Sequence, residues 1–244
     1  MARVDPHVKV LDDRVRELAI ERGLDAIVYA PHFTPWPDIV DRASQFSDER
    51  LLVVPARELF TGPWHDRKHV LAMDLENPIS DFLPREETMD DLVDQGACIV
   101  APHPGFLTMS LGFDDLRRFG EHVHAIEVYN PKFLPWHGPR AARVAAELDR
   151  PVIASSYAHL RSSVGAGWIE IENDIDGPGD VVEAIRSGAI EGIGRLGGAT
   201  RYRISATELA HLCWENSGKK LARTLRRGVP ATHPTGERYG GRYR

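Results

Sequence analysis

The chain has 244 residues, of which 42% are hydrophobic, and its formal net charge at pH 7 is −6. This length and apolar content are sufficient for one domain with a sizeable core. No run of 18 apolar residues occurs and the N-terminus lacks the apolar segment of a signal peptide, so we expect a soluble, cytoplasmic protein with no membrane partner. The two cysteines lie in different contexts, so any metal is expected to be held by histidine and carboxylate.

The charge is distributed unevenly along the chain. Residues 219–244 contain eight Lys or Arg and one acidic residue, whereas residues 1–218 contain 22 basic and 35 acidic residues. A basic tail can contact nucleic acid, although short basic tails are often only solvated chain ends. The acidic body argues against a broad phosphate-binding face.

Strand and helix patterns alternate, which is typical of an α/β fold. Short apolar runs predict strands at residues 4–10, 26–29, 51–54, 98–100, 125–128 and 151–155, with further candidates from residue 69 and at 168–173. Helices are predicted at about 12–22, 39–46, 88–95, 113–120, 139–148 and 179–187. We expect a barrel domain over residues 1–204, a helix packed on it over 205–227, opened by a Ser205–Glu208 capping box, and a disordered basic tail over 228–244.

Several of the apolar runs end in an ionisable residue, most clearly where residues 98–100 lead to His103 between two prolines. The carboxyl ends of strands converge on one crevice in α/β folds, and that crevice is the usual place of the active site. A lone histidine is more often a surface or hydrogen-bonded core residue than a ligand. These residues are candidates because they share a position at the carboxyl end of a predicted strand. The same pattern occurs at His7, His32, Glu58, Glu127 and His159.

In this order the motifs resemble the polymerase and histidinol phosphatase (PHP) family. The resemblance covers about residues 3–190 and implies a distorted seven-stranded β/α barrel, similar to a TIM barrel, which binds up to three metal ions and usually hydrolyses phosphoesters. It rests on DxH at His7, an apolar run ending at His32, Glu58 followed by His69, HP at His103, ExxN at Glu127 and SxAH ending at His159. Glu127 and Asn130 are expected to brace the barrel mouth or orient a ligand.

The chain departs from the family pattern at particular ligands. The second histidine of the first motif is replaced by Lys9, and the aspartate of the closing motif is replaced by Tyr157. The resemblance assigns one ion to Glu58, His69 and His103, and this set is intact. The set containing His7 and Glu58 and the set containing His32 and His159 each lack ligands. We therefore expect one well-held divalent transition metal and at most two, with zinc, manganese and iron all compatible.

Four further residues are candidates for catalysis. The ammonium group of Lys9 can replace a metal's positive charge, or can simply pair with a neighbouring carboxylate. Tyr157 can donate a proton to a leaving group, or can serve only for packing. Arg57 and Arg161 offer planar forks that match phosphate. Arginine is abundant in this chain, however, with 25 Arg against 5 Lys, so an arginine near a ligand residue is expected by chance.

Two classes of function follow. The first is a metal-dependent hydrolase, specifically a phosphoesterase that uses metal-activated water on a phosphorylated small molecule or nucleotide. The second is a non-catalytic RNA-binding or scaffold subunit, similar to PHP-like proteins of ribonuclease P, with nucleic acid bound through the basic tail. The degraded first motif and the tail favour the second class, whereas six retained ligand-type residues and the acidic body favour the first. An amidohydrolase-like reaction also stays open.

Overall fold

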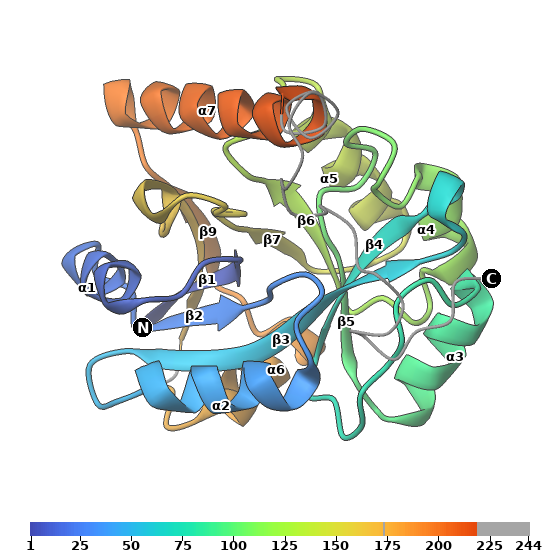
Figure 1. The fold of residues 1–244 in the computed structure, drawn as a ribbon, viewed down its shortest axis with the longest axis horizontal. Coiled ribbons are helices and arrows are strands. Elements are labelled where there is room, and N and C mark those ends of the chain that lie inside the picture. Colours follow the sequence, from blue (N-terminus) through green and yellow to red (C-terminus); the bar gives the residue numbers. More distant parts are fainter. Residues whose placement is uncertain (173, 219–244) are drawn as a thin grey trace, which may run out of the picture.

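The computed structural model describes residues 1–172 and 174–218, so the predicted tail at 228–244 lies outside the described residues (Figure 1). In this part, nine strands form one sheet in the order β7-β6-β5-β4-β3-β2-β1-β8-β9. The strands are β1 (Ala2–Val8), β2 (Ala26–Tyr29), β3 (Leu52–Thr61), β4 (Lys68–Met73), β5 (Cys98–Ala101), β6 (Ala125–Tyr129), β7 (Val152–Ala154), β8 (Gly167–Ile171) and β9 (Gly192–Arg195). The sheet curls into a nearly closed barrel.

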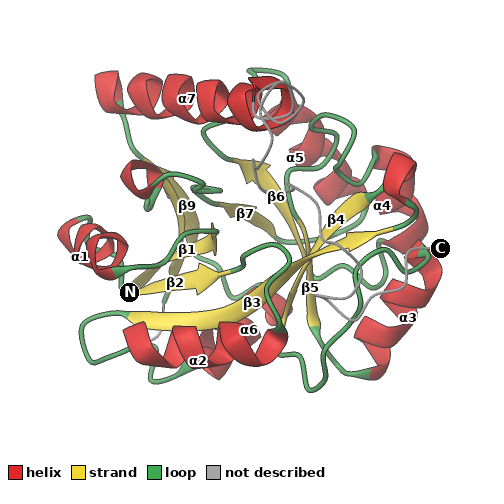
Figure 2. Ribbon diagram, viewed as in Figure 1, coloured by secondary structure: helices red, strands yellow, loops and turns green. Residues whose placement is uncertain are grey.

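Helices lie around the outside of this sheet (Figure 2). The α-helices are α1 (Asp13–Glu21), α2 (Trp36–Phe46), α3 (Arg85–Asp94), α4 (Phe113–Phe119), α5 (His137–Glu147), α6 (Pro178–Ser187) and α7 (Gly198–Cys213). Short helical turns occur at Trp64–Asp66, Arg161–Ser163 and Trp214–Gly218. No helix in the described ranges is both long and apolar enough to span a bilayer.

The strand directions explain why the barrel is distorted. β4 runs antiparallel to both β3 and β5, whereas the pairs β1–β2, β2–β3, β5–β6 and β6–β7 are parallel. At the end of β1, Val8 bridges to Ala158, just past β7, and the backbone N–H of Lys9 donates to the carbonyl of Ala158 at 3.0 Å. This bridge joins the first strand to the seventh, so β1–β7 form the predicted ring of seven.

The two additional strands continue the sheet from the start of β1. β8 pairs antiparallel with the first residues of β1, and β9 pairs antiparallel with β8. β8 was a candidate strand in the sequence, but β9 was not predicted. Its sequence, GIGR, holds two glycines and a single apolar residue, which gives no strand signal.

Apolar side chains fill the barrel on the side away from the predicted site. Val28, Met73 and Val100 belong to one buried cluster that also includes Val181 and Ile185 of α6. A larger cluster lies between the sheet and the surrounding helices. Because strands such as β2 and β5 are buried on both faces, they appear in the sequence as continuous apolar runs.

Two differences between the predicted and the observed boundaries affect the site. β3 does not end at residue 54 but continues through Pro55, which lies opposite the last residue of β2, so Glu58 lies within a strand and not beyond one. The final helix begins at Gly198 with Gly197 as its N-cap, which places Ser205 and Glu208 inside the helix. Glu208 therefore caps nothing, and its carboxylate is free to make the buried contacts described below.

Candidate metal centre

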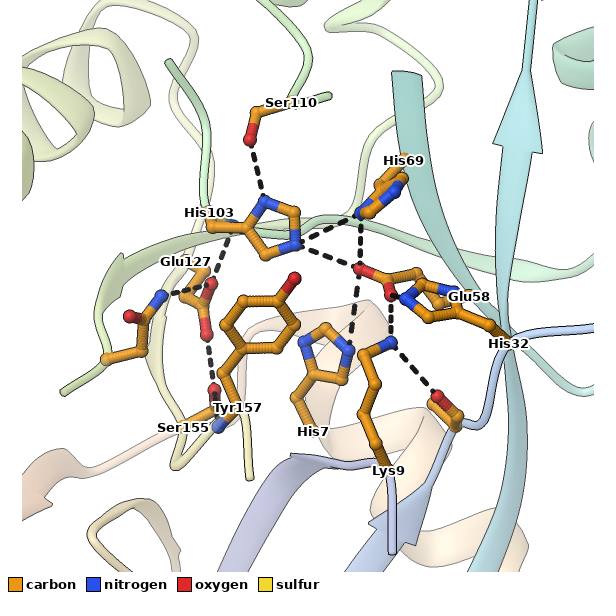
Figure 3. Close-up of polar contacts among 12 residues, drawn as sticks. His7, Lys9, His32, Glu58, His69, His103, Ser110, Glu127, Ser155 and Tyr157 are labelled. Atoms are coloured by element: carbon orange, nitrogen blue, oxygen red, sulfur yellow. Dashed lines mark hydrogen bonds and ion pairs between the residues drawn. The ribbon is translucent and has the colours of Figure 1, made fainter. Parts of the chain in front are cut away.

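Glu58 is the centre of a buried polar cluster inside the barrel (Figure 3). Its carboxylate is fully buried and comes from the middle of β3. The groups around it come from β1, β4 and the segments that follow β1, β2 and β5. They are His7 Nε2 at 3.6 Å, His32 Nε2 at 2.9 Å, His69 Nδ1 at 3.1 Å, His103 Nε2 at 2.8 Å, and the ammonium group of Lys9.

Three of these side chains converge closely enough to share one ion. Oε1 of Glu58 lies 2.8 Å from His103 Nε2 and 3.1 Å from His69 Nδ1, and the two ring nitrogens are 3.5 Å apart. Ligand bonds of roughly 2.0–2.2 Å in a tetrahedral site place the ligand atoms about 3.3–3.5 Å from one another, so the Glu58 carboxylate and the two rings need to separate only slightly to hold an ion. His32 also belongs to this region, since ligand atoms of His32, Glu58 and His69 all lie within 4.8 Å of one another.

The hydrogen bonds of His103 determine which of its nitrogens faces Glu58 without a proton. The hydroxyl of Ser110 donates to the carbonyl of Phe106, so its oxygen accepts at 2.7 Å from Nδ1 of His103. This arrangement places the imidazole proton on Nδ1 and directs the lone pair of Nε2 at the lone pairs of Glu58 Oε1. Two acceptors 2.8 Å apart repel each other, and a cation between them removes that repulsion.

Burial keeps the surrounding histidines neutral. It lowers the pKa of His7, His32, His69 and His103 well below the ordinary value, and neutral imidazole is the form that binds metal. Both ring nitrogens of His7 and one each of His32 and His69 are buried without a hydrogen-bond partner in residues 1–172 and 174–218. Neutral imidazoles gathered at a carboxylate suit zinc, manganese or iron, so the residues fit a transition metal.

Lys9 occupies the other side of the Glu58 carboxylate. Its side chain is 5% exposed, and its ammonium group contacts Glu58 Oε2 and the carbonyl of Ala30, the latter at 3.3 Å. Burial lowers the pKa of Lys9, whereas a carboxylate in direct contact favours the charged form. The lysine therefore neutralises the oxygen that does not face His69 and His103.

Tyr157 covers the cluster between two of the imidazoles. The centroid of its ring lies 4.8 Å from that of His7 and 4.4 Å from that of His103. Tyr157 and His103 both have positive φ, 44° and 35°, a strained conformation that tends to occur at functional sites. Burial raises the pKa of Tyr157, so its hydroxyl stays protonated and is a better hydrogen-bond donor than a proton source.

Glu127 braces this part of the barrel. Its Oε2 accepts from the backbone N–H of His103 at 2.5 Å and from Asn130 Nδ2 at 3.1 Å, and its Oε1 accepts from the hydroxyl of Ser155. The Ser155 oxygen in turn accepts from the backbone N–H of Tyr157 at 3.0 Å. The carboxylate thus ties together the segments after β5, β6 and β7, and these contacts fit a bracing role.

Residues 135–190 match the model of the PHP-associated family, and this segment includes Tyr157 and His159. This segment of the chain is therefore similar to the PHP-associated family. The sequence matches no curated protein. Among solved structures the domain is similar to PsfC from Pseudomonas syringae PB-5123, at 20% identity and a TM-score of 0.62, over 86% of this chain and 98% of that one.

Two other solved structures share this fold. The lesion-specific endonuclease PfuEndoQ from Pyrococcus furiosus is 14% identical, with a TM-score of 0.57 over 80% of this chain and 59% of that one. An amidohydrolase from Chromobacterium violaceum, solved with bound sulfate and no metal, is 12% identical, with a TM-score of 0.57 over 80% of this chain and 99% of that one. At these identities the likeness shows the fold alone.

The protein contains a second buried ion pair that the sequence did not reveal. Lys132 Nζ lies 2.9 Å from Glu208 Oε2 and 3.1 Å from His159 Nδ1, and it also donates to the carbonyl of Tyr157. Oε1 of Glu208 accepts from the backbone N–H groups of His159 and Leu160 at 3.1 and 3.0 Å. α7 thereby holds the segment after β7 in place. The apparent capping box concealed this role of Glu208.

His159 lies apart from the Glu58 cluster. Its Nδ1 is directed at Lys132 and at the carbonyl of Tyr157, and the ring of Tyr157 packs against it at 4.8 Å. Within the described residues the structure shows no ion pair or hydrogen bond between His159 and either Glu58 or His32. Of the six predicted metal ligands, five are brought together at Glu58, and His159 is not.

The structure places both predicted phosphate-binding arginines, Arg57 and Arg161, away from the Glu58 cluster. Arg57 precedes Glu58 in β3 and so points to the opposite face, where its buried guanidinium donates to the carbonyl of Ile79 and, at 2.7 Å, to Asp81. Arg161 is exposed and donates at 2.6 Å to Asp12, the N-cap of α1. Adjacency in sequence to a ligand residue was therefore a poor guide.

Proposed function

We propose that this PHP domain is a metal-dependent hydrolase whose substrate is a phosphoester. The observation that supports this most strongly is the triangle of Glu58 Oε1, His69 Nδ1 and His103 Nε2, with separations of 2.8 to 3.5 Å. Three protein ligands leave a coordination position open for water or substrate, as catalytic metal sites require. A structural ion would instead be enclosed by four.

The charges near the site favour an anionic substrate over a neutral amide. The chain has 5 lysines, and two of them, Lys9 and Lys132, are buried here against Glu58 and Glu208. These pairs leave the protein lining close to neutral, because the surrounding histidines are uncharged. The positive charge of a bound divalent ion would then not be neutralised by the protein and would attract an anionic substrate, such as a phosphorylated small molecule or nucleotide.

Each residue of the site has a separate role in the proposed reaction. Glu58, His69 and His103 would hold a divalent ion, which would supply an activated water and act as a Lewis acid. Ser110 keeps the lone pair of His103 Nε2 directed at the site. The ammonium group of Lys9 has three N–H groups. Two of them donate to Glu58 and to the carbonyl of Ala30. The third N–H can stabilise negative charge on a phosphoryl oxygen of the substrate. The hydroxyl of Tyr157 can donate a further hydrogen bond.

A substrate panel tests the proposal. The full-length protein is loaded separately with zinc, manganese and iron and assayed with p-nitrophenyl phosphate, bis(p-nitrophenyl) phosphate and the amide p-nitroacetanilide. We expect hydrolysis of at least one phosphate and loss of that activity in His103→Ala. Cleavage of the amide alone would contradict the substrate class. Metal binding without any turnover would favour the non-catalytic alternative, a PHP-like binding subunit.

A further inference from the structure

A cavity of about 430 Å³ lies outside the metal centre, between α5, β9 and the start of α7. Its volume is in the range of small-molecule sites. We call it the Tyr129 cavity, and its wall includes Tyr129, Phe133, Leu134, Ile193, Arg195 and Arg201. None of its lining residues is among the side chains that contact Glu58, so the cavity is separate from the site of the proposed hydrolysis.

Two arginines share one aromatic ring in this cavity. The guanidinium carbons of Arg195 and Arg201 lie 5.2 and 5.8 Å from the ring centroid of Tyr129. Neither arginine has a carboxylate partner among the residues that the structure describes, whereas Arg57 and Arg186 pair with Asp81 and Asp74. Like charges held at one ring repel each other, and a bound anion would replace this repulsion with attraction.

The hydroxyl of Tyr129 lies beside these arginines. Its oxygen is buried, and Arg201 is the side chain placed to donate to it. Burial raises the pKa of Tyr129, whereas the charges of Arg201 and Arg195 and the contact with Arg201 oppose that shift. A protonated phenol beside two guanidinium groups can donate its own proton to an anionic ligand.

The rest of the wall is apolar. Phe133, Leu134 and Ile193 line the cavity, and the exposed fractions of Leu134 and Ile193 are 39% and 44%. Exposed apolar side chains grouped around one cavity indicate a binding surface more than isolated ones do.

We propose that the Tyr129 cavity binds a small amphiphilic anion, with an apolar or aromatic body and a terminal phosphate or carboxylate. The anionic group lies between Arg195 and Arg201 and accepts from the hydroxyl of Tyr129, while the body packs against Phe133 and Leu134. The chain's own residues 219–244 have the wrong charge for this place, with eight Lys or Arg and one acidic residue. The proposal does not depend on hydrolysis at Glu58.

Calorimetric titration of the full-length protein tests this site. The probes are phenyl phosphate, phenylacetate and the neutral 2-phenylethanol, in a buffer with EDTA so that no metal supports hydrolysis. We expect one-to-one binding of at least one anion and at least tenfold weaker binding of the neutral probe. The tighter of the two anions identifies phosphate or carboxylate as the ligand's charged group.

Variants locate the binding. The double variant Arg195→Met, Arg201→Met should lower the affinity for the anion at least tenfold. Ala142→Trp, at an exposed lining position of α5, should prevent the anion from binding because the indole fills the cavity. Arg203→Met, an exposed arginine of α7 outside the cavity, should leave the affinity unchanged, as should His103→Ala. Binding lost in His103→Ala, binding unaffected by the double arginine variant, or no binding of either anion would each overturn the proposal.

Discussion

Ser110 sets the protonation of His103 through one hydrogen bond. Its oxygen accepts from Nδ1 of His103 at 2.7 Å while its own proton is donated to the carbonyl of Phe106. Ser110 follows the motif at His103 by seven residues and pairs with His69 in an isolated parallel β-bridge, a contact that no local sequence pattern predicts. A residue that fixes the tautomer of a ligand affects the metal without touching it.

Ser110→Ala should therefore weaken metal binding by about 10- to 100-fold, the usual effect of removing such a partner. Without the hydroxyl, the Nδ1 proton has no acceptor, and the tautomer with the proton on Nε2 becomes accessible. Metal affinity is measured by competition with a chromophoric chelator. Ser163→Ala is the matched control, since Ser163 is also buried but has no hydrogen-bond partner for its hydroxyl in the described part of the chain. Equal affinities in the two variants would contradict the role of Ser110.

Lys9 and Tyr157 lie where the resemblance places two further metal ligands. In the structure the ammonium group of Lys9 contacts Glu58 Oε2, and the ring of Tyr157 lies against His7. A cation and a phenol ring thus occupy the space beside His7. This explains in physical terms why we expect fewer ions than the family pattern allows.

Lys9→His combined with Tyr157→Asp should raise the metal stoichiometry by about one equivalent. The pair of changes frees Glu58 Oε2 and supplies an imidazole and a carboxylate beside His7, which together make a second set of ligands. Stoichiometry is read by calorimetric titration of metal into the chelator-treated protein. Lys9→Met serves as control, because it removes the ammonium group without adding a ligand. An unchanged stoichiometry in the double variant would refute this assignment of the site.

At the scale of elements, α7 contributes to the site from outside the ring of seven strands. It lies against the end of the barrel where the segment after β7 emerges, and Glu208 holds that segment through two backbone N–H groups (Figure 1). The same carboxylate pairs with Lys132, and both side chains are fully buried. A buried charge that loses its partner is costly, because it can no longer be solvated.

Glu208→Gln should lower the free energy of unfolding by about 3–5 kcal/mol, since it leaves the Lys132 charge buried without a partner. Urea denaturation followed by circular dichroism gives this value. The control is Glu17→Gln, which breaks an ion pair with Arg14 in which both side chains are more than half exposed, and there we expect almost no loss of stability because solvent screens the pair. A loss as small as that in Glu208→Gln would mean that the buried pair does not hold α7 in place.

The elements that the sequence predicted well are those with a local physical cause. β2 was placed correctly because four consecutive buried residues leave a continuous apolar run, and α1 because its buried residues, Val15 and Ala19, recur at helical spacing. The edge strand β9 and the continuation of β3 past Pro55 had no such pattern. Neither did the pair of Lys132 and Glu208, whose contact depends on where α7 packs.

At the scale of the whole molecule, closure of the ring brings the predicted ligands together. His7, His32, Glu58, His69 and His103 come from segments spread over about a hundred residues, and only the curled sheet places them around one carboxylate. The order of the motifs was enough to predict the barrel. Other features of the site depend on how side chains are directed within the closed barrel, which no local sequence pattern encodes. They are the distances between Glu58 and the histidines, the position of His159 away from Glu58, and the outward direction of Arg57.

The central claim is that Glu58, His69 and His103 hold a catalytic transition metal. Metal content by inductively coupled plasma mass spectrometry tests it most directly, on full-length protein purified without chelator or metal-affinity resin. We expect about one equivalent of zinc, manganese or iron, and none in a folded His103→Ala variant. Protein without metal, even after reconstitution with each of the three ions, would contradict it.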